Sequence, residues 1–144
     1  MAQSTIGDFG SGSDHLPSIR REGITASREG SMNTIHSSAW LKIHPGKLDE
    51  FKDVARRCME SVRTKDTGTL QYDWFLNDAG TVCAVREAYR DSDAVFEHMG
   101  NLGDTLGDLM AVCEMDLEIY GTPSQPLIDA LTEAGAKFYV PMSE

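Results

Sequence analysis

Apolar and polar residues alternate along residues 35–43, and a period of two predicts a β-strand. Pro45-Gly46 then interrupts the pattern, and apolar residues recur at spacings of three and four, which predicts a helix over residues 47–63. The apolar stripe of this helix consists of Leu48, Phe51, Val54, Ala55, Cys58, Met59 and Val62. Gly68 is the expected stop signal of the helix.

The next two segments alternate again and are separated by a turn sequence. "TLQYDWFL" (residues 69–76) and "TVCAVREAYR" (residues 81–90) flank "NDAG", which is typical of a β-hairpin. Leu70, Tyr72, Trp74 and Leu76 are expected to share one face of the first of these strands.

A second helix is predicted to follow, capped by Asp91 or Ser92. It is expected to break at Gly100 and to continue through a poorer helical stretch that contains Gly103 and Gly107. A strand over residues 114–121, a helix over residues 126–135 and a short strand over residues 137–140 complete the pattern.

This order of elements predicts an α+β fold of the ferredoxin-like β-α-β-β-α-β type, with an antiparallel sheet and both helices on one face. The opposite face of such a sheet would still carry apolar and aromatic side chains. A second copy of the chain could cover them, so we expect a homodimer that packs sheet against sheet.

Composition divides the chain into two regions. Residues 1–32 are dominated by Gly, Ser and charged residues without period, which predicts a flexible N-terminal tail, either an addition before an original start at Met32 or an extension that wraps a partner subunit. Residues 33–144 are expected to form the single domain.

The charge and the cysteines limit the partners and the compartment. The net charge of −10 argues against a nucleic-acid partner. No apolar run approaches the length of a membrane span, and no signal peptide is recognised. Three cysteines without a CxxC motif favour buried, reduced thiols in a cytoplasmic protein.

Candidate chemistry gathers where the hairpin meets the second helix. Glu87 lies between Val85 and Tyr89 on one strand face, so it is either a structural ion-pair partner of an Arg or a carboxyl group whose pKa is raised by an apolar pocket. His98 borders the apolar stripe of its helix, which suits either a core residue or a general base.

Aromatic residues surround these two. Tyr72, Trp74 and Tyr89 form either a packed core or a flat slot for an aromatic ring. Trp40 suits a dimer interface better than the slot.

Metal and nucleotide motifs are absent from the sequence: His36 and His44 lie about 26 Å apart along a strand, and neither HExxH nor a GxGxxG motif after a strand occurs.

Four segments in order, "LKIHPGKLDEFKDVA", "GTLQYDWFLN", "REAYRDSDAVFEHM" and "LEIYGTPS", resemble the antibiotic biosynthesis monooxygenase domain family, which includes small quinol monooxygenases. The best-matching pattern comprises Glu87, Tyr89, Asp91, Ala94 and His98. The resemblance implies a subunit of a dimeric α+β barrel. It also implies oxygenation of phenols, quinols or anthrones by O₂ without metal, flavin or haem.

The chain departs from two patterns in that family. Many relatives carry a second His-Phe pair where this chain has "GNLGD", and haem-degrading relatives carry an Asn near the position of Ala39. The resulting hypothesis is a cofactor-independent monooxygenase acting on a small quinol-like or polyphenolic aromatic. His98 and Glu87 would be catalytic, and Tyr72, Trp74, Tyr89 and Trp40 would bind the substrate. The alternative is a non-catalytic dimer that binds a small hydrophobic ligand.

Overall fold

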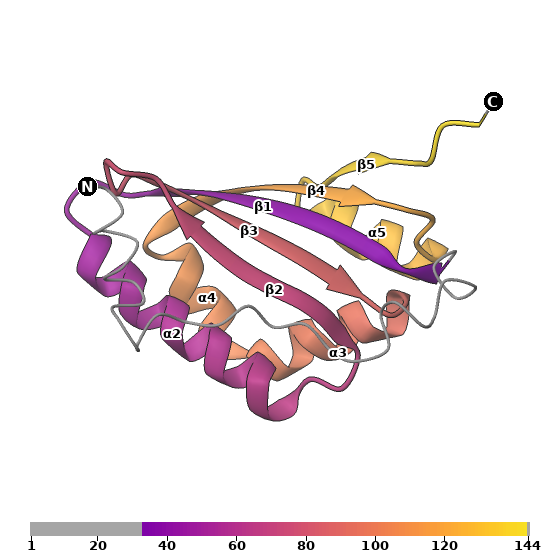
Figure 1. Cartoon of the computed structure of the whole chain (residues 1–144), viewed down its shortest axis with the longest axis horizontal. Coiled ribbons are helices and arrows are strands. Elements are labelled where there is room, and N and C mark those ends of the chain that lie inside the picture. Colours follow the sequence, from indigo (N-terminus) through magenta and orange to yellow (C-terminus); the bar gives the residue numbers. More distant parts are fainter. Residues whose placement is uncertain (1–32, 144) are drawn as a thin grey trace.

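The computed structural model describes residues 33–143, so the predicted tail at residues 1–32 lies outside the described residues. Within this range five strands form one sheet in the order β2-β3-β1-β4-β5, and the helices cover one of its faces (Figure 1). The strands are β1 (Ile35–Ile43), β2 (Thr69–Leu76), β3 (Val82–Tyr89), β4 (Cys113–Tyr120) and β5 (Lys137–Tyr139). The helices are α2 (Leu48–Lys65), α3 (Ser92–Leu102), α4 (Asp104–Met110) and α5 (Gln125–Glu133).

The first four strands are all antiparallel and reproduce the predicted ferredoxin-like order. The short strand β5 extends the β4 edge in parallel, and α5 is the crossover that connects the two. The α+β prediction is therefore confirmed, and β5 is the short strand predicted over residues 137–140.

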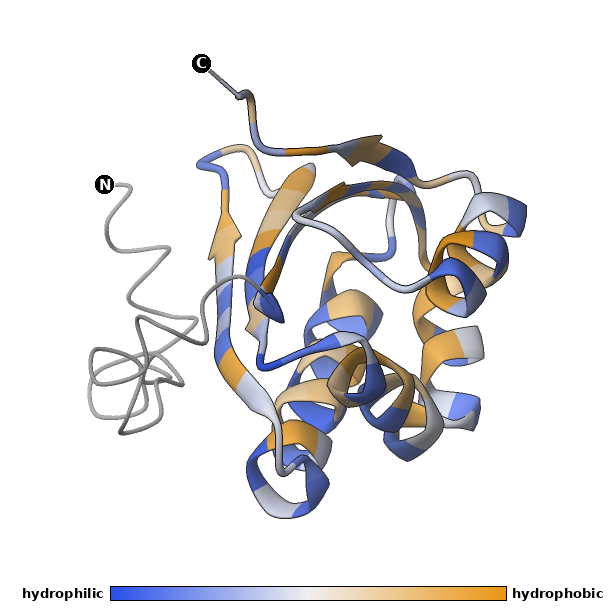
Figure 2. Cartoon of the chain, turned by 90° about the vertical axis from the view of Figure 1, so that its right-hand side faces the viewer, coloured by the Kyte–Doolittle hydropathy of each residue, from blue (hydrophilic) through white to orange (hydrophobic). Residues whose placement is uncertain are grey.

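The alternation in β1 separates the two faces of the sheet. Leu41 and Ala39 are buried on the face toward the helices, whereas Trp40 is exposed on the other. Ser37 lies opposite Glu87 on β3 and opposite Ile119 on β4, so residues from three strands meet on the helix side. Figure 2 views these layers from another side and shows hydrophobic and hydrophilic residues interleaved along the strands and helices.

The β2 strand departs from strict alternation at its start. Its register against β3 shifts between Thr69 and Gln71, which leaves Leu70 without a partner opposite. Tyr72 and Leu76 are buried, but Leu70 is not part of the core they join. The predicted four-residue face therefore holds only from Tyr72 onward.

Gly68 has a different role from the predicted one. Helix α2 ends at Lys65, and its C-cap Asp66 is extended, with no left-handed glycine involved. A Cβ atom on Gly68 would lie 2.6 Å from Cβ of Ala94. Gly68 is therefore needed because the loop after α2 passes very close to α3.

The second helical region breaks at Gly103 and not at Gly100. Gly103 has φ +50°, a left-handed conformation that interrupts the helix, whereas Gly100 and Gly107 remain inside α3 and α4. The predicted N-cap is confirmed, because the Asp91 side chain accepts a hydrogen bond from the Ala94 backbone N–H at 2.9 Å.

The three cysteines are free and buried, as predicted. Burial raises the pKa of the Cys58 and Cys83 thiols to about 12 and that of Cys113 to about 11. A helix with the length and hydrophobicity of a membrane span is not found among residues 33–143.

Candidate functional site

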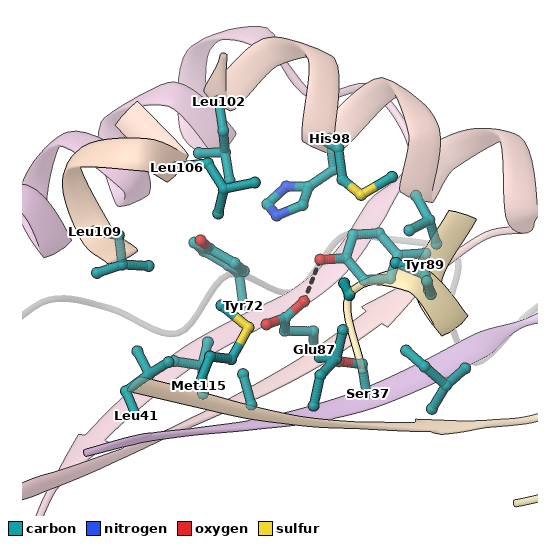
Figure 3. Close-up of a pocket in the computed structure, with 18 of the residues that line it drawn as sticks. Ser37, Leu41, Tyr72, Glu87, Tyr89, His98, Leu102, Leu106, Leu109 and Met115 are labelled. Atoms are coloured by element: carbon teal, nitrogen blue, oxygen red, sulfur yellow. Dashed lines mark hydrogen bonds between the residues drawn. The ribbon is translucent and has the colours of Figure 1, made fainter. Parts of the chain in front are cut away.

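A cavity of about 280 Å³ lies between the sheet and the helices α3, α4 and α5. Its wall is mostly apolar, and side chains from β1, β3, α3, α4 and β4 all contribute (Figure 3). The lining side chains that carry a nitrogen or oxygen atom are Ser37, Tyr72, Trp74, Glu87, Tyr89 and His98. The cavity therefore combines an apolar interior with a few polar groups, as small-molecule sites commonly do.

Glu87 projects from β3 into this cavity. Its Oε1 accepts a short hydrogen bond from the Tyr89 hydroxyl, which lies on the same strand face (Figure 3). Burial raises the pKa of Glu87, and this effect outweighs the opposing influence of His98 and of the Tyr89 hydroxyl. Among residues 33–143, Glu87 forms no ion pair, so the predicted partnership with an Arg is not found there.

His98 approaches from α3, on the opposite side of the cavity, and only 6% of its surface is exposed. Its Nδ1 lies 2.9 Å from Oδ2 of Asp66. The ring contacts Tyr72 and Tyr89 edge-on or tilted, with both centroid distances at 5.2 Å. The histidine is therefore held on one edge by a carboxyl group and flanked by two phenols.

Three side chains hydrogen-bond to the carboxylate of Asp66. Its Oδ2 accepts from the Thr69 hydroxyl at 2.6 Å, and its Oδ1 accepts from the Asn101 amide at 2.8 Å. Burial by itself raises the pKa of Asp66, but the hydrogen bonds from His98, Asn101 and Thr69 together bring the pKa below its ordinary value. Asp66 therefore carries its negative charge inside the protein.

The aromatic side chains form a connected wall. Tyr72 packs edge-on against Trp74 at a centroid distance of 5.7 Å, and Trp74 contacts Phe51 of α2 at 6.1 Å. Burial is the main cause that raises the pKa of both Tyr72 and Tyr89 well above the ordinary value. Both phenols therefore remain neutral near pH 7 and can donate hydrogen bonds.

The structure brings five of the six predicted site residues to one cavity: His98, Glu87, Tyr72, Trp74 and Tyr89. Trp40 is not among the cavity residues. It is 43% exposed on the outer face of the sheet, and its Nε1 donates to Glu118 at 3.2 Å. The period of two already assigned Trp40 to the face opposite Ala39 and Leu41, and that signal placed it away from the helices.

Sequence reasoning missed Asp66 and Asn101. Asp66 belongs to a loop that was interpreted only as the end of α2. Asn101 lies three residues after His98, and residues at this spacing share a helix face, so the spacing was a usable signal. No local signal in the sequence connects Asp66 with His98, because 32 residues separate them.

These groups suit acid–base chemistry on a small, largely apolar molecule. A neutral imidazole accepts a proton, a carboxyl group with a raised pKa exchanges one, and neutral phenols orient polar substituents. In the described range 33–143, no group of three or more His, Cys, Asp or Glu side chains is arranged to hold a metal ion.

A family model described as antibiotic biosynthesis monooxygenase matches residues 34–102 of the chain. This segment runs from the start of β1 to the end of α3, so it contains Asp66, Glu87 and His98. No curated protein sequence matches the chain significantly.

Solved structures share the fold at low sequence identity. MupZ from Pseudomonas fluorescens has a TM-score of 0.65 and 20% identity, over 78% of this chain and 93% of its own. A conserved protein from Methanosarcina mazei has a TM-score of 0.58 and 17% identity, over 65% of this chain and 97% of its own. SnoaB from Streptomyces nogalater, a cofactor-independent oxygenase, has a TM-score of 0.55 and 15% identity, over 65% of this chain and 96% of its own.

Proposed function

Because residues 34–102 belong to the antibiotic biosynthesis monooxygenase family, we propose that the protein is a monooxygenase that oxidises a quinol-like or polyphenolic aromatic with O₂. One observation carries the proposal most directly. The cavity places a histidine, a buried carboxyl group and neutral phenols around an apolar interior of about 280 Å³. A structural neighbour, SnoaB, is described as a cofactor-independent oxygenase, which supports the same class of reaction.

The proposed reaction begins with proton transfer. His98 removes the phenolic proton, and the resulting anion is electron-rich enough to pass one electron to O₂. Recombination of the two radicals forms a carbon–oxygen bond and a peroxide at the ring carbon. The peroxide takes up a proton, and loss of the hydrogen on the same carbon as a proton then breaks the O–O bond. One oxygen leaves as water and the other remains as a carbonyl oxygen, so the substrate supplies all the electrons.

The remaining cavity residues support these steps. Glu87 faces His98 across the cavity, and its raised pKa suits exchange of the proton that leaves with water. Tyr72, Trp74 and Tyr89 hold the aromatic ring, with the phenol hydroxyls as hydrogen-bond donors. The apolar wall limits the access of water to the reactive anion.

The test is oxygen consumption with a panel of reduced quinones and anthrones. His98→Ala is compared with the wild type, and His44→Ala serves as the matched control because His44 does not line the cavity. Loss of a general base is expected to slow turnover by roughly 10²- to 10⁴-fold, whereas the control keeps its rate. Equal rates for wild type and His98→Ala would contradict the proposed role of His98.

The alternative function is binding of a small hydrophobic ligand without turnover. The apolar cavity supports binding in either case, so binding alone does not separate the two functions. Calorimetric titration with an oxidised quinone measures affinity, and the oxygen electrode measures turnover with the reduced form. Tight binding with no oxygen consumption across the panel would favour the alternative.

We also propose that two copies of the chain pair through the outer face of the sheet. Trp40 and Phe75 are 43% and 55% exposed on this face, which favours burial against a second copy. Sedimentation is expected to show a dimer at micromolar concentration, and a monomer would contradict the pairing.

The unpaired, buried cysteines favour the cytoplasm as the compartment.

A further inference from the structure

We infer that Asp66 is a positioning residue for His98, and that it holds the imidazole in the tautomer that carries its proton on Nδ1 and its lone pair on Nε2. The inference depends on the proposed function only for its effect on turnover. The tautomer itself is a property of the free protein.

Besides His98, two neighbouring side chains hydrogen-bond to Asp66. Thr69 donates to Oδ2 through its hydroxyl, and Asn101 donates to Oδ1 through its amide. A charged carboxylate can only accept hydrogen bonds, and the lowered pKa of Asp66 favours that charged state. The contact between Nδ1 and Oδ2 at 2.9 Å therefore requires a proton on the imidazole nitrogen.

The consequence appears on the other edge of the ring. A neutral imidazole with its proton on Nδ1 has its lone pair on Nε2. Within the described residues, Nε2 forms no hydrogen bond, and His98 lines the cavity together with Tyr72, Tyr89 and Glu87. The ionisable group at the Nδ1 edge of His98 is therefore Asp66. Around the cavity, the ring faces the neutral phenols of Tyr72 and Tyr89 and the carboxyl group of Glu87.

The loop that carries Asp66 is attached to the helix that carries His98. The Thr67 backbone N–H and hydroxyl both donate to the Glu97 carboxylate, at 3.0 and 3.1 Å. Gly68 passes so close to Ala94 that even a methyl group would collide. These two contacts attach the loop to one face of α3 and so fix the carboxylate relative to the imidazole, which a residue with a positioning role requires.

The first experiment measures the tautomer directly in the full-length wild-type protein. Nitrogen-15 NMR of labelled histidine distinguishes protonated from unprotonated ring nitrogens, and His98→Gln assigns the His98 signals among the four histidines. At about pH 8, where an ordinary histidine is neutral, we expect a protonated Nδ1 and an unprotonated Nε2. A neutral ring with its proton on Nε2 would overturn the inference without any variant.

The second experiment compares Asp66→Asn with Asp53→Asn, an exposed carboxyl group of α2 that pairs with Arg56. Where the NH₂ group of the new amide faces Nδ1, it donates to that nitrogen, so the tautomer with its proton on Nε2 becomes populated. We expect kcat to fall on the order of 100-fold with KM little changed, because the wrong tautomer removes the base and leaves the slot intact. Asp53→Asn should match the wild type.

The outcomes separate the two proposals. If the wild type has the expected tautomer but oxidises no substrate of the panel, the proposed function fails and the role of Asp66 as a positioning residue stands. If the wild type turns over and Asp66→Asn changes neither the tautomer nor kcat, the inference about Asp66 fails alone.

Discussion

Replacement of Gly68 by Ala tests the close contact between the loop after α2 and α3. The new methyl carbon would lie 2.6 Å from Cβ of Ala94 and 3.1 Å from a guanidinium nitrogen of Arg90. Carbon atoms in contact prefer a separation of about 3.5–4.0 Å, so α3 or the loop must move by about 1 Å. Such over-packing costs about 1–3 kcal/mol.

A smaller effect acts in the opposite direction. Alanine restricts the unfolded chain more than glycine does, which stabilises the folded state by about 0.4–1 kcal/mol. The mid-range values of the two effects leave a net loss of about 1.3 kcal/mol, which corresponds to a fall in Tm of about 5 °C for a domain of this size. Thermal unfolding followed by far-UV circular dichroism measures it.

The chain provides a matched control in the same helix region. Gly100 lies inside α3, and a Cβ atom there would meet no atom within 4 Å. Gly100→Ala should therefore stabilise the protein by about 0.5–1 kcal/mol, as expected for a helix interior. A Gly68→Ala variant as stable as the wild type, together with the expected gain in Gly100→Ala, would contradict a close contact at Gly68.

Three further predictions concern the cavity and the core. The raised pKa of Glu87 means that protonated Glu87 stabilises the folded state below pH 4.5 and that this contribution is lost as pH rises through the folded-state pKa. In urea unfolding, the free energy of unfolding of Glu87→Gln should therefore increase relative to that of the wild type over the same rise in pH. A difference that stays constant with pH would contradict the raised pKa. The thiols of Cys58, Cys83 and Cys113 should resist a thiol reagent at about pH 8 in the folded protein and react on denaturation, since burial disfavours the thiolate; reaction in the folded state at the rate of a free thiol would contradict this. Ala39→Leu adds volume to the sheet side of the cavity and should weaken binding of an oxidised quinone in calorimetry without unfolding the domain; unchanged affinity would mean that the ligand binds elsewhere.

The predictable part of this fold is the part that repeats with a fixed period. Alternation in β1 separated Ala39 from Trp40 correctly, and the strand order followed from the sequence of elements. Local patterns failed where a tertiary contact decided the outcome. Gly68 is explained by Ala94, which lies 26 positions away in the chain, and not by the end of the preceding helix.

The helix break shows the same limit on a smaller scale. Gly100 and Gly103 look alike in sequence, and only the backbone conformation at Gly103 distinguishes them. In the candidate site, His98 and Glu87 could be proposed from the sequence because they lie on either side of the junction between β3 and α3. Asp66 could not, because it joins them only after α2 and α3 have packed together.

The carboxyl and imidazole groups occupy only one part of the length of the cavity. Ser37 pairs with Glu87, whereas Leu41, four residues along β1, pairs with Cys83 and Met115. Four residues of strand span about 13 Å, so the carboxyl and imidazole groups lie well away from the aliphatic part of the cavity near Leu41, Leu109 and Met115 (Figure 3). A ligand whose hydroxyl group binds to the carboxyl or imidazole group is then held at a defined distance from that aliphatic part. For an aromatic with several oxidisable positions, this polarity of the cavity would dictate regioselectivity: the carbon that reacts is the one at a fixed distance from the anchored hydroxyl.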